Sequence, residues 1–263
     1  MNKRIGLLSL LALLVPALGA AQDAFTGTWK VDLGTAKFPK KPDVYLLQNG
    51  MYTCETCVPP INVKADGEDQ TVTGHPYYDA INVKVVDDHT VELTEKRNGK
   101  TVGTNKLQAS TDGKTLTFDF VDATATNADP VTGKVEAVRV KAGPAGAHAI
   151  SGSWRTEKAD TVSDNGLVFT YKVSGDALEM TTPTGQSYTA KLDGTDAPYH
   201  GDPGTTSVSV KKLGPNTIEE TDKRDGKVIS VSRMTVAGDG KTANIATDDK
   251  LHGTRSEIAA TKQ

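Results

Sequence analysis

The two cysteines of the chain, Cys54 and Cys57, have a Cys-x-x-Cys spacing that serves redox centres, metal sites and disulfides. A thioredoxin-type thiol needs a helix N-terminus, and the two prolines that follow the motif oppose a helix there. A zinc site needs two more ligands, for which His75 and His89 are the nearest candidates. A β-turn brings the Cα atoms of residues i and i+3 within about 7 Å. A turn-spanning disulfide is therefore the leading prediction, with metal binding and redox chemistry left open.

Carboxylates gather in two related segments, "TVELTEKRNGK" from Thr90 and "TIEETDKRDGK" from Thr217. A carboxylate pair that performs acid–base work needs one desolvated member with a raised pKa. The alternation of these acids with Thr and Lys instead predicts a solvent-exposed strand face for Glu92, Glu95, Glu219, Glu220 and Asp222. No nucleophile elbow, phosphate loop or calcium loop is found in the sequence. We therefore expect a protein that is not an enzyme, with no catalytic residues, no metal and no cofactor.

The first 21 residues have the pattern of a secretory signal peptide. A basic pair, Lys3 and Arg4, precedes an apolar run from Ile5 to Leu18, and small residues end the segment at Ala21. Because the run is shorter than the roughly 20 apolar residues that span a bilayer, we expect cleavage rather than a retained anchor. The prediction is a periplasmic or secreted protein with no integral membrane segment after signal cleavage.

Charge and composition narrow the function classes further. Loss of the two basic signal residues changes the formal net charge from −3 to −5. An acidic surface gives no electrostatic footprint for nucleic acid, so we expect no nucleic-acid partner. The 37% hydrophobic and 24% charged residues fit a globular protein with a modest core.

The chain contains an internal duplication. A shift of 127 residues places Val83 on Val210, superposes the two acidic segments, and places "DGKT" at Asp112 on "DGKT" at Asp239. A shift of 125 places "FTGTWKVD" at Phe25 on "ISGSWRTE" at residue 150. A repeat of this length indicates tandem homologous domains. We assign them to residues 25–141 and 150–262, joined by a Gly/Ala/Pro-rich linker at 142–149 and preceded by the signal at 1–21.

Each half has the pattern of β-strands. Runs rich in β-branched residues, such as residues 80–86 and 89–97, are separated by turn signals. Asn98-Gly99 and Asp225-Gly226 are the dipeptides that type I′ hairpin turns favour. No window of the mature chain has a sustained helical period. The prediction is an all-β protein with about eight antiparallel strands per half, enough to close an up-and-down barrel, and little helix.

The opening "FTGTWKVD" resembles the first strand of lipocalins and fatty-acid-binding proteins, the calycins. Phrases such as "VTGHP", "VSVKKLGPNTIEETDKRDGKV" and "AGDGKT" resemble a group of secreted bacterial lipocalin-like proteins of unassigned function. This resemblance implies two tandem lipocalin-like barrels with Trp29 and Trp154 in structural roles at their closed ends. It also implies that arginines on late strands could bind a ligand carboxylate, which makes Arg139 and Arg233 candidates.

Tyrosines supply the remaining candidates for ligand contact. Tyr77 and Tyr78 in "PYYD" and Tyr199 in "PYHG" fall near an expected barrel mouth, where they would line an entrance or anchor a loop. The resulting hypothesis is non-catalytic binding of a small apolar or amphipathic ligand within the barrels. The alternative is a structural or interaction protein of the cell envelope whose barrels are filled by side chains.

Overall fold

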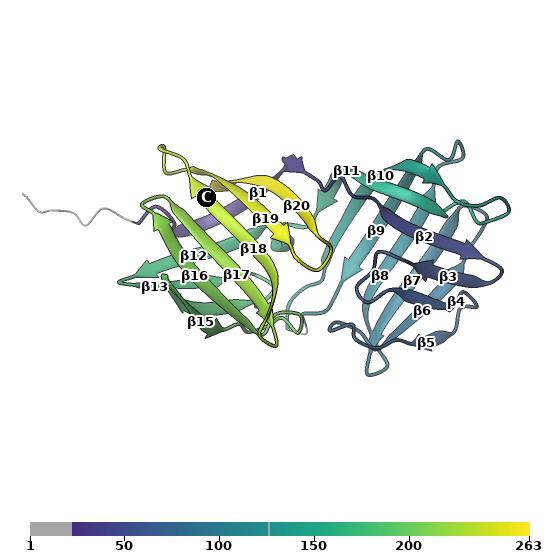
Figure 1. The fold of residues 1–263 in the computed structure, drawn as a ribbon, viewed down its shortest axis with the longest axis horizontal. Coiled ribbons are helices and arrows are strands. Elements are labelled where there is room, and N and C mark those ends of the chain that lie inside the picture. The colour runs from purple at the N-terminus through teal and green to yellow at the C-terminus, as the bar shows by residue number, and fades with distance from the viewer. Residues whose placement is uncertain (1–22, 126) are drawn as a thin grey trace, which may run out of the picture.

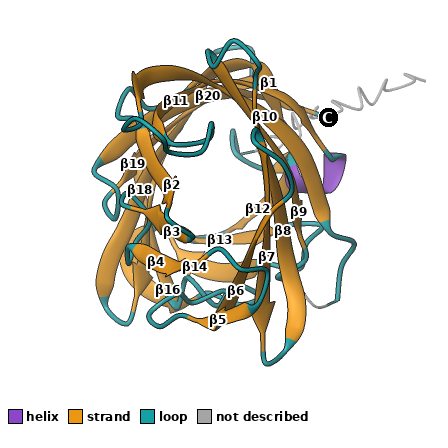
Figure 2. Ribbon diagram, turned by 90° about the vertical axis from the view of Figure 1, so that its right-hand side faces the viewer, coloured by secondary structure: helices purple, strands orange, loops and turns teal. Residues whose placement is uncertain are grey.

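The computed structural model describes residues 23–125 and 127–263 and is almost entirely β-structure. The predicted signal peptide, residues 1–21, lies outside the described residues. Two ten-stranded antiparallel sheets each curl into a nearly closed barrel, and the barrels lie side by side (Figure 1). Seen along the long axis, the strands form a ring (Figure 2). The all-β prediction is confirmed, but each sheet has ten strands rather than about eight, since strands of three or four residues leave no alternation to detect.

We call the sheet that contains β2 to β11 barrel 1. Its strands are β2 (Asp43–Gln48), β3 (Met51–Cys54), β4 (Ile61–Lys64), β5 (Asp69–Thr71), β6 (Ala80–Val85), β7 (Thr90–Arg97), β8 (Lys100–Ala109), β9 (Thr115–Asp122), β10 (Val131–Ala142) and β11 (Gly152–Val162). The other sheet is barrel 2. Its strands are β1 (Gly27–Lys37), β12 (Val168–Ser174), β13 (Ala177–Thr181), β14 (Ser187–Lys191), β15 (Asp193–Pro198), β16 (Ser207–Gly214), β17 (Thr217–Arg224), β18 (Lys227–Val236), β19 (Thr242–Asp249) and β20 (Thr254–Lys262). A single 3₁₀ turn (Asp164–Gly166) connects β11 to β12.

The two halves of the sequence exchange their opening strands. Strand β1 pairs with β12 and β20 of the second half, and the purple β1 lies beside the yellow β20 in Figure 1. Strand β11 pairs with β10 and β2 of the first half. Barrel 1 is therefore one continuous segment within residues 43–162, whereas barrel 2 combines residues 27–37 with residues 168–262. The halves bounded at 25–141 and 150–262 thus do not coincide with the barrels.

Local turn chemistry folds as the dipeptides indicate. Asn98 and Gly99 have φ values of 52° and 74°, and Asp225 and Gly226 have φ values of 51° and 79°. These positive values at both central residues define the type I′ turn that joins two antiparallel strands. The turns connect β7 to β8 and β17 to β18, so the predicted hairpins are confirmed.

Each barrel core is built around one tryptophan from the exchanged strand. Trp29 in barrel 2 is 0% exposed and Trp154 in barrel 1 is 1% exposed. Each indole N–H donates a 2.8 Å hydrogen bond to the backbone carbonyl four residues earlier. A basic side chain covers each ring, with the Arg139 guanidinium 3.9 Å from the Trp154 ring centroid and the Lys262 ammonium 4.8 Å from that of Trp29.

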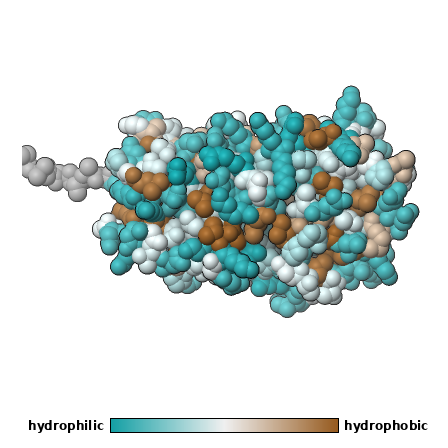
Figure 3. All heavy atoms as spheres, viewed as in Figure 1, coloured by the Kyte–Doolittle hydropathy of each residue, from teal (hydrophilic) through white to brown (hydrophobic). Residues whose placement is uncertain are grey.

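The outer surface is predominantly polar. Figure 3 shows apolar residues in separate small groups among hydrophilic ones on the face it displays. Within the described part of the chain, no helix is long and apolar enough to cross a membrane.

Candidate functional site

A cavity of about 200 Å³ lies inside barrel 2. Most of its lining is apolar or aromatic and comes from β12, β13, β17, β18 and β19: Phe169, Tyr171, Met180, Ile218, Met234 and Ile245. Three polar side chains complete the lining: Thr182, Glu220 and Ser232. Apolar walls with a few polar groups are the usual construction of a small-molecule site.

The period of strand β17 turns its acids toward different sides. Ile218 is buried in the core, so Glu220 and Asp222, two and four residues later, face the same interior. Glu219 faces outward, where its carboxylate pairs with the Arg233 guanidinium at 2.7 Å. The expectation of a solvated face is therefore wrong for Glu220 and Asp222.

Glu220 is held by tyrosine hydroxyl groups. Its Oε2 accepts a 3.1 Å hydrogen bond from the Tyr171 hydroxyl and a second bond from the Tyr188 hydroxyl. Burial raises the pKa of Glu220 to about 7, and the neighbouring Asp222 carboxyl acts in the same direction. The two tyrosine hydrogen bonds act in the opposite direction because they stabilise the carboxylate. A desolvated acid thus sits in the wall of an apolar cavity.

Asp222 extends this acidic group. The Ser230 hydroxyl donates a 2.7 Å hydrogen bond to Asp222 Oδ2, while the buried Oδ1 has no partner among the described residues. Burial raises the pKa of Asp222, and the Asp202 carboxylate adds to that rise. The interior of barrel 2 therefore concentrates negative charge that serine and tyrosine hydroxyl groups solvate only in part.

Barrel 1 has a different interior at the same positions. The shift of 127 residues that relates the paired strands places Leu93 on Glu220 and Phe118 on Ile245. The Tyr45 ring packs 6.0 Å from that of Phe118 and 6.4 Å from that of Tyr52, measured between centroids, so aromatic side chains fill this space. A leucine opposite Glu220 in the duplicated copy was the signal in the sequence that this position faces inward.

Barrel 1 has one buried acid of its own. Glu95 is the counterpart of Asp222, and its carboxylate lies against Gly103, where a Cβ atom would come 2.5 Å from it. Burial raises the pKa of Glu95 to about 7, and the Asp122 carboxylate acts in the same direction. Glu95 therefore also departs from the expected solvated face. Glu92 keeps to it, on the outer side beside Lys84.

The candidate tyrosines are placed at three different sites. Tyr199 follows β15 and packs on the barrel 2 core, with its ring 5.7 Å from that of Tyr188, beside the acidic group. The Tyr78 ring stacks on His75 at 4.8 Å and packs on the barrel 1 core. The Tyr77 hydroxyl lies against Gly204 of barrel 2, so closely that a Cβ atom there would overlap it. Tyr77 therefore fixes the contact between the barrels.

The candidate arginines lie away from the cavity lining. The Arg139 guanidinium donates hydrogen bonds to the backbone carbonyls of Gly113, Ser151 and Ala149, at 2.6 Å for Ser151 and 2.7 Å for Ala149, while it stacks on Trp154. These bonds tie the chain around the tryptophan end of barrel 1. The other candidate, Arg233, is more than half exposed on the outer surface.

A cleft of about 250 Å³ between the barrels adjoins the cavity. Its walls come from the end of β9 and the start of β10 in barrel 1 and from the β13–β14 turn and β12 in barrel 2. Thr182 lines both the cleft and the cavity. The interior of barrel 2 therefore reaches toward the side of the molecule occupied by barrel 1.

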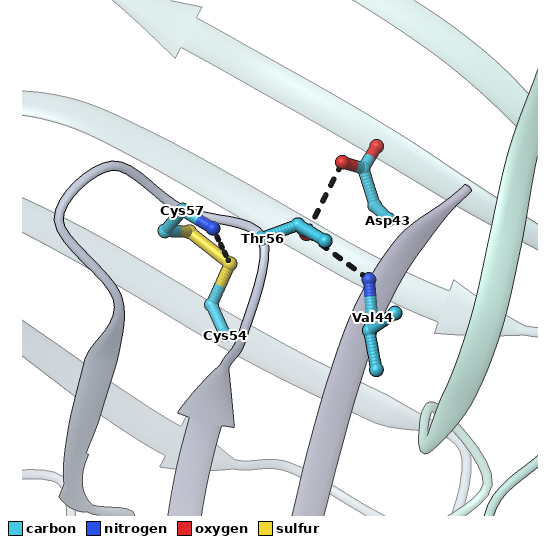
Figure 4. The surroundings of a disulfide bond; sticks show 5 residues. All are labelled: Asp43, Val44, Cys54, Thr56 and Cys57. Carbon is cyan, nitrogen blue, oxygen red and sulfur yellow. Dashed lines mark hydrogen bonds between the residues drawn. A yellow bond between two sulfur atoms is a disulfide. The ribbon is translucent and has the colours of Figure 1, made fainter. Parts of the chain in front are cut away.

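Cys54 and Cys57 lie at disulfide distance, with their Cα atoms 5.5 Å apart. Cys54 ends β3 with its side chain in the core, and Cys57 follows in the loop to β4 (Figure 4). Between them, the Thr56 hydroxyl donates to Asp43 at 3.3 Å and accepts from the Val44 N–H group at 3.1 Å. The pair thus belongs to a loop bound to β2. Among the described residues, no group of three or more His, Cys, Asp or Glu side chains is arranged to hold a metal ion.

Fold and site together define an all-β protein of two nearly closed ten-stranded barrels, one with an acid-bearing cavity and one filled. No protein-family model matches the chain, and no curated protein matches it either.

Proposed function

We propose that the protein binds one small, largely apolar molecule inside barrel 2, without catalysis, in the periplasm or outside the cell. The observation that carries the proposal is the cavity of about 200 Å³, with apolar walls and the polar groups of Thr182, Glu220 and Ser232. Its resemblance to secreted bacterial lipocalin-like proteins and its signal-like first 21 residues support the proposed class and location.

The cavity volume limits the ligand. Sites for drug-sized molecules occupy about 300–1,000 Å³. A space of about 200 Å³ suits a compact molecule rather than a long acyl chain. Fold-level analogy alone does not establish function, so the cavity rather than the barrel shape supports the proposal.

The alternative, a filled barrel with a structural role, is favoured for barrel 1. The packed rings of Tyr45, Tyr52 and Phe118 occupy the interior there. Aromatic rings of this kind contribute large buried areas. We therefore propose a division of roles in which barrel 1 supports and barrel 2 binds.

Methionine methyl groups allow a direct test. Met180 and Met234 line the cavity, while Met51 on β3 of barrel 1 is 37% exposed and serves as an internal control. In NMR of protein labelled with ¹³C-methyl methionine, 2-phenylethanol should shift the signals of Met180 and Met234 saturably and leave that of Met51 unchanged.

The control variant is Ile245→Phe, which installs the residue that barrel 1 has at the same position, Phe118. It should retain the folded spectrum and lose the titration because the added ring fills the cavity. If compact neutral probes leave both cavity methionines unchanged in the natural protein, the proposal is wrong.

A further inference from the structure

We propose that the molecule bound in barrel 2 is an organic cation, a compact amine whose ammonium group pairs with Glu220. This inference rests on the proposed function and specifies its ligand class. It is carried by the placement of a buried carboxylate in a cavity wall without a basic partner.

The hydrogen bonding of Glu220 leaves a position for a donor from the cavity. Tyr171 and Tyr188 both donate to Oε2. No other N–H or O–H group of the residues that the structure describes donates to this carboxylate. Since Glu220 lines the cavity, a bound ammonium group can reach its second oxygen, Oε1.

The charges around Glu220 are not balanced by protein. The groups that act on its carboxyl are those of Asp222, Tyr171 and Tyr188, none of them basic. Asp222 in turn is affected by Asp202, Ser230 and Glu220. The neighbouring ring is that of Tyr199. Buried charges in proteins are normally paired, because an unpaired charge loses its hydration without compensation.

Basic side chains on the same strand are engaged elsewhere. Lys223 pairs with Asp196 at the surface, and Arg224 donates a 2.6 Å hydrogen bond to the Gly204 carbonyl. The lining of the cavity, within the described residues, includes neither Lys nor Arg. A ligand cation is therefore the group that completes the site.

The rest of the lining fits the non-polar part of such an amine. Met180 and Met234 offer polarizable thioether groups, and the faces of Phe169 and Tyr171 offer aromatic contacts that also favour a cation. A carboxylate ligand meets like charge at Glu220 and Asp222. The site thus discriminates against fatty acids by charge as well as by size.

Three probes of similar shape test the inference on the full mature chain: phenethylamine, 2-phenylethanol and 3-phenylpropanoate. With Met180 and Met234 as NMR reporters at pH 8, phenethylamine should bind about tenfold or more tightly than the alcohol, and the carboxylate most weakly. At pH 5.5 the preference for the amine should decrease, because protonation of Glu220 removes the charge that attracts it.

Two matched variants locate the effect. Glu220→Gln keeps the side-chain size and an acceptor for the tyrosines, so it should reduce phenethylamine binding to the level of the alcohol. Glu219→Gln changes the outward-facing neighbour and should leave the preference intact. Glu220→Leu, the residue at position 93 of barrel 1, provides a second neutral variant if Glu220→Gln does not fold.

The outcomes separate this inference from the function on which it rests. If 2-phenylethanol binds at the cavity methionines and phenethylamine binds no more tightly, the amine inference is overturned while ligand binding stands. The same conclusion follows if both neutral variants keep the preference for the amine. If none of the probes reaches Met180 and Met234, both proposals are wrong.

Discussion

The exchange of opening strands gives an unusual prediction about which barrel a mutation weakens. Trp29 precedes every strand of barrel 1 in the sequence, yet its indole is buried in barrel 2 between β12 and β20. Trp29→Ala should therefore destabilise barrel 2, and Trp154→Ala should destabilise barrel 1. If each half formed its own barrel, the effects would be reversed.

The magnitude follows from what each indole contacts. Trp29 is fully buried, donates a 2.8 Å hydrogen bond to the Phe25 carbonyl, and lies under the Lys262 ammonium. Truncation of such a side chain destabilises a core by about 3–5 kcal/mol. Amide exchange that requires opening of that barrel should become about two to three and a half orders of magnitude faster.

Hydrogen exchange with peptide-level mass spectrometry reads the two barrels separately. In Trp29→Ala, peptides within residues 168–262 should lose protection more than those within residues 43–142. The reverse should hold for Trp154→Ala, which makes each variant the control for the other. Faster exchange of residues 43–142 in Trp29→Ala, with residues 168–262 unchanged, would refute the exchanged topology.

Four further predictions follow from the same contacts. A fragment of residues 40–165 contains all ten strands of barrel 1 and should unfold cooperatively in urea, as seen by tryptophan fluorescence; a non-cooperative loss would contradict the continuous barrel. Because the pKa values of Glu95 and Glu220 are raised from 4.5 to about 7, the folded state holds protons that the unfolded state has lost in this window. Stability should thus fall as pH rises from about 4.5 to 7, by up to about 1.4 kcal/mol per pH unit per site, and Glu95→Gln and Glu220→Gln should flatten the curve of urea midpoint against pH. Cys57→Ala should lower the free energy of unfolding by about 2 kcal/mol or less, since so short a loop restricts little chain entropy, and a reductant should then have no further effect. Arg139→Met should destabilise barrel 1 by about 2–4 kcal/mol in urea melts, through the three carbonyls left without their donor, and should leave probe binding at Met180 and Met234 unchanged.

Much of the fold can be predicted from local sequence chemistry. Asn-Gly and Asp-Gly pairs specify their hairpins because positive φ is a property of the turn itself. The exchange of β1 and β11 cannot be predicted in this way, because both openings carry the same Gly-x-Trp motif and fit either barrel. Strand pairing between interchangeable segments depends on the connections, and local patterns do not encode those.

The candidate site was hidden for a different physical reason. Strand β17 has polar side chains on both faces, so the hydrophobic alternation that identifies an inward face is absent around Glu220. The corresponding strand β7 has Val91 and Leu93 at the inward positions, and there the alternation is clear. Comparison of the two copies therefore identifies the face that one copy alone leaves ambiguous.

The duplication suggests how one chain can support a destabilised binding site. A buried acid such as Glu220 lowers stability above its pKa, and an unfilled cavity forgoes packing contacts. Barrel 1 avoids both penalties with Leu93 and Phe118, and as a continuous segment it can form before the second half is complete. Barrel 2 then closes around β1, which barrel 1 already carries at its N-terminal side. Strand exchange thus makes the filled barrel a permanent neighbour of the binding barrel, because neither can lose the other without losing its own tryptophan strand.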